Sequence, residues 1–120
     1  MTTLIQEDPR LATRELTPNL LDYIVQKIVA AIHPQKIILF GSWARGNAGL
    51  DSDLDLFIVY DGDENERLVR RKIDLMFWGR EFGMDILVSR PEEVAMYLQR
   101  REPFYLYHVL RDGKIVYERK

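Results

Sequence analysis

Two aspartates stand two residues apart at the head of an apolar run, in the segment Asp53-Leu54-Asp55-Leu56. Because side chains alternate between the two faces of a strand, a strand over 53–60 would place both carboxylates on one face, about 7 Å apart. Two carboxylates in an apolar strand repel each other, and burying them is costly unless a cation balances their charge. Carboxylate oxygens suit Mg²⁺, which keeps water and phosphate oxygens as its other ligands. The pair therefore predicts a divalent metal site.

A third acid repeats this pattern farther along the chain. Asp85 stands next to a short apolar run, and the segment 84–88 is predicted to form another strand. Asp74 and Glu81 compete for the same role, but Asp74 falls in a helical pattern and Glu81 lies outside the strand. Three carboxylates on adjacent strands can hold two metal ions about 3.5–4 Å apart, which stabilise the attacking and leaving oxygens of an in-line displacement at phosphorus.

A Gly-Ser turn follows the strand predicted over 36–40, and it is a candidate for binding the phosphates whose metal ions the acids would hold. Gly41 lets the backbone approach a phosphate closely, and Ser42 offers a hydroxyl and an amide. A helical turn predicted over 42–46 would point its N–H groups toward an anion. The turn is not a Walker A loop, since the pattern G-x-x-x-x-G-K-[ST] does not occur in the chain.

Arg45 follows the turn, and two uses for it stay open: it contacts a phosphate, or it braces the loop against Asp51 or the sheet. Taken alone, the Gly-Ser pair is explained by an ordinary turn and the Asp-x-Asp pair by acids at a loop end. The order of strand, Gly-Ser, Asp-x-Asp, strand and lone acid is hard to explain by packing. The combination predicts a site that holds a nucleoside triphosphate and its metal ions.

Helices and strands that position these residues alternate along the chain. Thr17-Pro18 predicts a helix start, because threonine caps helices and proline suits the first helical position. Apolar spacing predicts helices at 18–32, 64–79, 91–101 and 104–111, and strands at 36–40, 53–60, 84–88 and 114–118. This order predicts an α/β (α+β) fold, a small mixed sheet with helices packed against it. We expect one domain over 17–120, preceded by a loosely attached arm over 1–16.

Composition limits the classes of protein to which the chain can belong. The 120 residues are 47% apolar, which allows a real core, and no cysteine is present to form a disulfide or a thiolate zinc site. No run is long enough to span a bilayer and no signal peptide is visible, so we expect a soluble cytoplasmic protein. The net charge of −2 gives no strong nucleic-acid signal. A basic cluster is expected to be a solvated face, with contact to a nucleotide or an acidic partner as the alternative; its members are Arg67, Arg70, Arg71 and Lys72.

The glycine-serine and aspartate segments together resemble the signature of the DNA polymerase β-like nucleotidyltransferase superfamily, in particular its minimal (MNT) branch. The segments concerned are Gly41-Ser42-Trp43-Ala44-Arg45-Gly46 and Ser52-Asp53-Leu54-Asp55-Leu56. The resemblance covers roughly residues 18–118 and implies the polymerase β-like fold. By position, it implies that Asp53 and Asp55 bind metal with Asp85 as the third carboxylate, and that Gly41 and Ser42 hold the triphosphate.

The activity implied by the resemblance is attack by an acceptor hydroxyl on the α-phosphorus of a nucleoside triphosphate, with Asp85 helping to deprotonate the acceptor. ATP would be the donor of AMP, and Mg²⁺ the metal, with two ions bound. Minimal members are commonly paired with a small helical HEPN toxin, whose tyrosine receives the AMP, so the first hypothesis is an antitoxin of this kind. The alternatives are transfer to a small molecule such as an aminoglycoside, and a nucleotide- or partner-binding protein without turnover. The sequence leaves the base, the acceptor and the oligomeric state open.

Overall fold

The computed structural model describes residues 8–49 and 52–120, in which helices and strands follow the predicted order. The elements are η1 Pro9–Leu11, α1 Pro18–Ile32, β1 Lys36–Phe40, α2 Gly41–Arg45, β2 Leu54–Val59, α3 Glu66–Met76, β3 Met84–Ser89, α4 Pro91–Arg100, η2 Phe104–Arg111 and β4 Lys114–Glu118. Of the two elements labelled η, the first is a 3₁₀ turn and the second is a π-helix.

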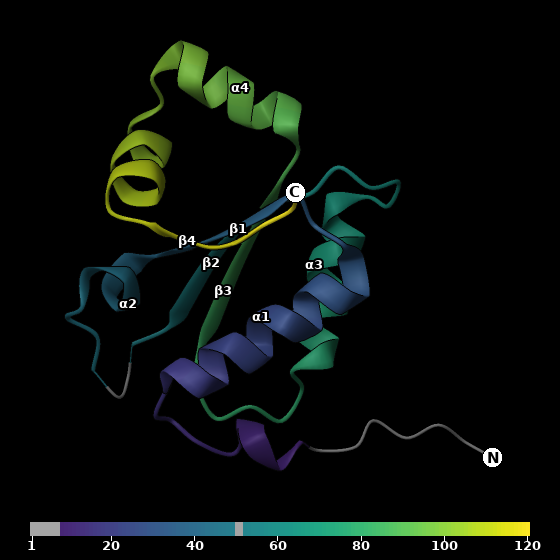
Figure 1. Cartoon of the computed structure of the whole chain (residues 1–120), viewed down its shortest axis with the longest axis vertical. Coiled ribbons are helices and arrows are strands. Elements are labelled where there is room, and N and C mark those ends of the chain that lie inside the picture. Colours follow the sequence, from purple (N-terminus) through teal and green to yellow (C-terminus); the bar gives the residue numbers. More distant parts are fainter. Residues whose placement is uncertain (1–7, 50–51) are drawn as a thin grey trace.

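The four strands form one mixed sheet in the order β3-β2-β1-β4. β1 lies in the middle and pairs antiparallel with both β2 and β4, whereas β2 and β3 run parallel. Helix α3 provides the crossover that a parallel pair requires. Figure 1 shows α1 and α3 on one side of the sheet, and α4 with the yellow-green turn of η2 on the other. The prediction of a small mixed sheet with helices packed against it is confirmed.

Alternation along β2 divides the core into two layers. Leu54, Leu56 and Ile58 belong to a large buried cluster with the apolar stripe of α1 and α3. Phe57 and Val59 point the other way, into a smaller cluster with residues of η2 and α4. Both faces of the central strands are therefore covered, and the face that carries Phe57 is the one that continues back to the predicted carboxylates.

Helix α3 is shorter than the predicted helix 64–79, because a side-chain cap fixes its start. The side-chain oxygen of Asn65 accepts a hydrogen bond of 2.8 Å from the Arg67 N–H, so the first helical residue is Glu66. The helix ends at Met76, and Phe77 packs fully buried beneath it. The basic cluster consequently starts one residue into the helix.

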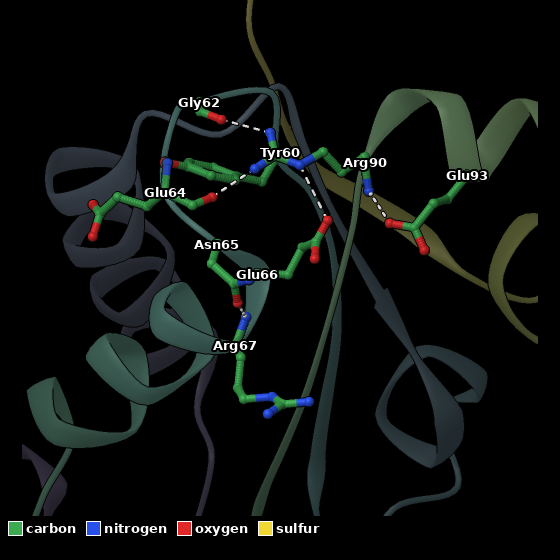
Figure 2. Close-up of polar contacts among 8 residues, drawn as sticks. All are labelled: Tyr60, Gly62, Glu64, Asn65, Glu66, Arg67, Arg90 and Glu93. Atoms are coloured by element: carbon green, nitrogen blue, oxygen red, sulfur yellow. Dashed lines mark hydrogen bonds and ion pairs between the residues drawn. The ribbon is translucent and has the colours of Figure 1, made fainter.

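Arg90 fixes the loop before α3 to the start of α4, a role that the sequence pattern did not indicate. Its guanidinium donates hydrogen bonds to the carbonyl oxygens of Gly62 at 2.5 Å and Glu64 at 2.6 Å. Its Nε donates to the Glu66 carboxylate at 3.1 Å, and the group lies 5.4 Å from the centre of the Tyr60 ring. Figure 2 shows these contacts converging on one side chain. Arg90 thereby ties two segments that are far apart in sequence.

The segment before α1 is part of the fold where the structure describes it. Leu11 and Leu16 are buried in the same cluster as α1, with 1% and 7% of their surfaces exposed. The Glu81 N–H donates a hydrogen bond of 3.1 Å to the Leu11 carbonyl, and the Arg10 guanidinium lies 4.5 Å from the centre of the Tyr23 ring. The expectation of a loosely attached arm is wrong for these residues, because two leucines complete the core. Residues 1–7 lie outside the described part.

Among residues 8–49 and 52–120, no helix is both long enough and apolar enough to cross a membrane. The cytoplasmic location stays a prediction.

We predict that Leu11→Ala lowers the free energy of unfolding by about 3 kcal/mol, because it leaves a cavity in the main core. Leu75→Ala is the matched control, since the Leu75 side chain is 50% exposed and its loss changes the same quantity by only about 0.5 kcal/mol. Urea unfolding followed by circular dichroism measures both. Equal midpoints for the two variants would show that the segment before α1 does not contribute to the core.

Candidate functional site

Gly41 forms a tight turn directly against the carboxylate of Asp55. β1 ends at Phe40, which pairs with Asp55 in the antiparallel ladder, and Gly41 follows with a φ of +75°. A Cβ atom placed on Gly41 would lie 2.1 Å from the Asp55 Oδ2 atom, which is closer than two such atoms can approach. The backbone angle therefore favours glycine at this position, and a larger residue would also have to displace the Asp55 carboxylate. The predicted turn and the predicted acid are thus neighbours in space.

Asp55 and Asp85 lie side by side in the parallel pair of strands. The register of β2 and β3 places Asp55 opposite Asp85 and Phe57 opposite Leu87. Because residues two apart in a strand share a face, both acids lie on the face that packs against η2 and α4. Asp55 is half-buried, whereas Asp85 is exposed. The structure therefore brings together two of the three predicted carboxylates.

Asp53 occupies the same region but its side chain turns toward Gly83. The residue is exposed and directly precedes β2, where the Leu54 N–H donates a 2.8 Å hydrogen bond to the Gly83 carbonyl. A Cβ atom on Gly83 would lie 1.8 Å from the Asp53 Oδ1 atom, so the carboxylate rests against that glycine. Two glycines thus make room for the two acids of the Asp-x-Asp pair.

The electrostatic cost of this arrangement falls on Asp55. Burial raises the pKa of the Asp55 carboxyl to about 6, with further increases from the negative charges of Asp85 and Asp53. The positive charge of Arg45 opposes the shift but is the smallest of these effects. The acids therefore act on one another through space, and a bound cation would reverse the direction of the effect.

The donor chemistry of the acids fits a hard divalent cation, since all three offer carboxylate oxygens. Within the described part of the chain, however, no three histidine, aspartate or glutamate side chains are gathered closely enough to hold a metal ion. The orientation of Asp53 toward Gly83 accounts for this, because only Asp55 and Asp85 are paired in register. Asp53 is exposed, so its side chain is free to rotate toward the other two. The residues fit the metal in type and backbone position, and a rotation of Asp53 would complete the set.

The remaining predicted residues flank this pair of acids. Ser42 is half-buried in α2, and its hydroxyl makes no hydrogen bond to any described residue. Arg45 ends α2, is exposed, and likewise makes no ion pair within the described ranges. Helix α2 has five residues, too few for a sizeable dipole, so the expected help from a helix N-terminus is not available. Asp51, the alternative partner of Arg45, lies outside the described residues.

Trp43 and Ser52 make hydrogen bonds close to the start of β2, a role that the sequence pattern did not indicate. The Trp43 indole N–H donates a hydrogen bond of 3.4 Å to the Ser52 carbonyl, and the Ser52 hydroxyl accepts one of 2.9 Å from the Gly49 N–H. A serine three residues after a glycine, just before a strand, is a turn signal that could have indicated the second contact. These contacts fix where Asp53 enters β2.

Comparisons with known proteins found one family match and a similar fold. A family model described as "Polymerase beta, Nucleotidyltransferase" matches residues 23–120. The chain is also similar in fold to the crystal structure of a candidate nucleotidyltransferase from Sulfolobus solfataricus, with 21% identity and a TM-score of 0.52 over 84% of this chain and 79% of that one. No curated protein matches the chain.

We predict that Asp55→Asn stabilises the metal-free protein in a pH-dependent manner. The folded-state pKa of Asp55, about 6, lies above the ordinary value of 3.8 for an aspartate, so the stability that its protonated form contributes is present below pH 4 and is lost as the pH rises through 6. Asparagine removes this loss. The advantage of the variant should grow by about 1 kcal/mol between pH 4 and pH 8, after allowance for solvent screening. Thermal unfolding in a chelator measures it, and an advantage independent of pH would contradict the charge assignment.

Proposed function

The chain belongs to the polymerase β nucleotidyltransferase family, and from this membership we propose that it transfers AMP from ATP to a hydroxyl acceptor. The observation that supports the site is the adjacency of the Gly41 turn to Asp55, with Asp85 directly across in the next strand. A phosphate-binding turn beside two carboxylates suits a triphosphate held by its oxygens and by a cation.

The proposed reaction is a displacement at the α-phosphorus. The acceptor hydroxyl oxygen forms a bond to that phosphorus, while the bond from phosphorus to the oxygen bridging to the β-phosphate breaks and pyrophosphate leaves. The hydroxyl proton passes to the exposed carboxylate of Asp85 and from there to water. The amide of Gly41 and the hydroxyl of Ser42 stabilise the negative charge on the phosphate oxygens. Arg45 contacts the same phosphates, since its guanidinium makes no ion pair within the described part.

Mg²⁺, when bound, would neutralise charge on the triphosphate and polarise its oxygens. Asp53, Asp55 and Asp85 are the residues that would hold it, because they share donor type and lie at the same end of neighbouring strands. The same binding would remove the repulsion that raises the pKa of Asp55. Triphosphate and metal would therefore bind together, each lowering the electrostatic cost of the other.

For the acceptor we propose a tyrosine of a helical HEPN toxin, with this chain acting as the antitoxin. The resemblance of residues 41–46 and 52–56 to the minimal branch of the superfamily supports this choice. A phenolic hydroxyl also suits a carboxylate base, because its pKa of about 10 makes it easier to deprotonate than an aliphatic alcohol.

We predict that Asp53→Asn, Asp55→Asn and Asp85→Asn each reduce magnesium-dependent transfer by at least about 100-fold, because each removes a negative oxygen ligand. The measurement is incorporation of label from ATP carrying it at the α-phosphate, with the co-expressed partner as acceptor. Label at the γ-phosphate should not be transferred, since pyrophosphate leaves.

Asp74→Asn is the matched control for these variants. Asp74 is an exposed acid on α3 that pairs with Arg80 at 3.5 Å, outside the candidate site. Its replacement should leave transfer within about twofold of the wild type, since surface changes of this kind rarely matter. Full activity in Asp55→Asn, or transfer of the γ-phosphate, would contradict the proposed reaction.

A further inference from the structure

A groove of about 830 Å³ runs along β3 beside the candidate site. One wall comes from the first turns of α3 and the other from α4 and η2, and the floor is formed by the second half of β3 with Phe57 of β2. We call it the β3 groove; the lining residues used below are Arg67, Arg70, Leu87, Ser89, Tyr97 and Phe104. None of the predicted site residues lines it, so it is a separate feature of the surface.

The β3 groove begins where the candidate site ends. Leu87 lies two residues after Asp85 on the same face of β3, and Phe57 lies two residues after Asp55 on β2. Phe40 pairs with Asp55 in the antiparallel ladder, so the Gly41 turn that follows it lies toward the start of β2. Phe57 and Leu87 lie on the other side of the acids, farther along β2 and β3. The triphosphate side and the groove side are therefore on opposite sides of the acid pair. A molecule lying in the groove could bring a hydroxyl to Asp85 without displacing the phosphates.

Charged side chains of both signs line the groove: Arg67 and Arg70 lie on the α3 wall, and three glutamates also line it. Glu66 accepts from the Arg90 guanidinium, Glu93 accepts a 3.0 Å hydrogen bond from the Arg90 N–H, and Glu102 accepts from two backbone N–H groups at the start of η2. Glu66 is therefore paired with a cation, whereas Glu93 and Glu102 keep their negative charge while their oxygens cap backbone N–H groups.

The two arginines of the groove are not occupied in this way. Within the described ranges, the guanidinium groups of Arg67 and Arg70 make no hydrogen bond or ion pair, and both side chains are exposed. Figure 2 shows Arg67 extending away from the Arg90 contacts, with a dashed line only at its backbone nitrogen. Two available guanidinium groups on the α3 wall favour a ligand that places carboxylates against that wall.

The other groups of the groove suit an extended polypeptide. β3 ends the sheet, and none of its backbone groups hydrogen-bonds to a described residue outside the ladder with β2, apart from the Ser89 carbonyl, which accepts from Tyr60. An extended segment can pair with such an edge. The aromatic rings serve less well as stacking platforms for bases, because Tyr97 packs against Tyr105 at 5.6 Å and Phe104 against Phe40 at 5.7 Å.

We propose that the β3 groove binds the acceptor protein through an extended acidic segment, held by Arg67 and Arg70 and presenting a hydroxyl to Asp85. The name acceptor rests on the proposed function, whereas binding of the acidic segment can be tested without nucleotide. Two members of the basic cluster, Arg67 and Arg70, would bind the acidic segment. Arg71 does not line the groove.

Fluorescence anisotropy tests the binding. The probes are a labelled peptide of aspartates and glutamates around one tyrosine, the same peptide with lysines in place of the acids, and a labelled single-stranded oligonucleotide. We expect the wild type to prefer the acidic peptide, and Arg67→Glu with Arg70→Glu together to weaken that binding at least tenfold, as the loss of interface arginines commonly does.

Arg71→Glu is the matched control, because it makes the same change of charge on the same helix but outside the groove. It should retain binding within about twofold, as expected for a surface charge remote from an interface. Equal loss in Arg71→Glu, equal binding of the lysine peptide, tighter binding of the oligonucleotide, or no binding of any peptide would each overturn the proposal.

Labelling of the same peptides separates this inference from the proposed function. With ATP labelled at the α-phosphate, the tyrosine peptide should be labelled and its phenylalanine counterpart should bind equally but remain unlabelled. Binding of the acidic peptide without labelling would keep the groove assignment and contradict transfer to tyrosine. Labelling without preference for the acidic peptide would keep the reaction and overturn the groove assignment.

Discussion

Asp55 is a half-buried carboxylate with Asp85 opposite it in the next strand and the Gly41 backbone against its oxygen. Burial and two neighbouring negative charges raise its pKa to about 6, so the metal-free protein is destabilised by this residue at neutral pH. Because a bound cation would offset the electrostatic cost of the ionised Asp55 carboxylate, this position favours the binding of a metal ion. The proposed metal binding and catalysis both depend on that single carboxylate, and the Gly41 turn lies directly against it.

The fold supplies the rigidity that keeps these charges together. β2 is covered on one face by α1 and α3 and on the other by η2 and α4, so Asp55 cannot retreat into solvent without disturbing a packed strand. Arg90 ties the loop before α3 to the start of α4 and thereby fixes the ends of both walls of the β3 groove. The segment before α1 contributes Leu11 to the same core. The packed elements on both faces of β2 hold Asp55 in place for a substrate.

Sequence alone predicted the features that depend on local period and could not predict those that depend on tertiary pairing. Alternation placed Asp55 on the same face of β2 as Phe57, because a strand repeats every two residues, whereas Asp53 directly precedes β2 and lies outside it. The parallel register that sets Asp85 opposite Asp55 depends on how α3 packs, and no local pattern contains it. The turn of Asp53 toward Gly83 is a side-chain orientation set by a neighbouring loop. Leu11 is an isolated leucine in an aperiodic segment, so only the assembled core reveals its role.

We propose that a divalent cation binds with a nucleoside triphosphate between the Gly41 turn and the acids at the start of β2 and β3. Paramagnetic broadening by Mn²⁺, added with a non-hydrolysable ATP analogue to isotope-labelled protein, locates the ion most directly. We expect the amide signals of Gly41, Asp55 and Asp85 to broaden first, and Asp55→Asn to abolish this effect. Broadening that starts elsewhere on the surface, or that persists unchanged in Asp55→Asn, would contradict the account.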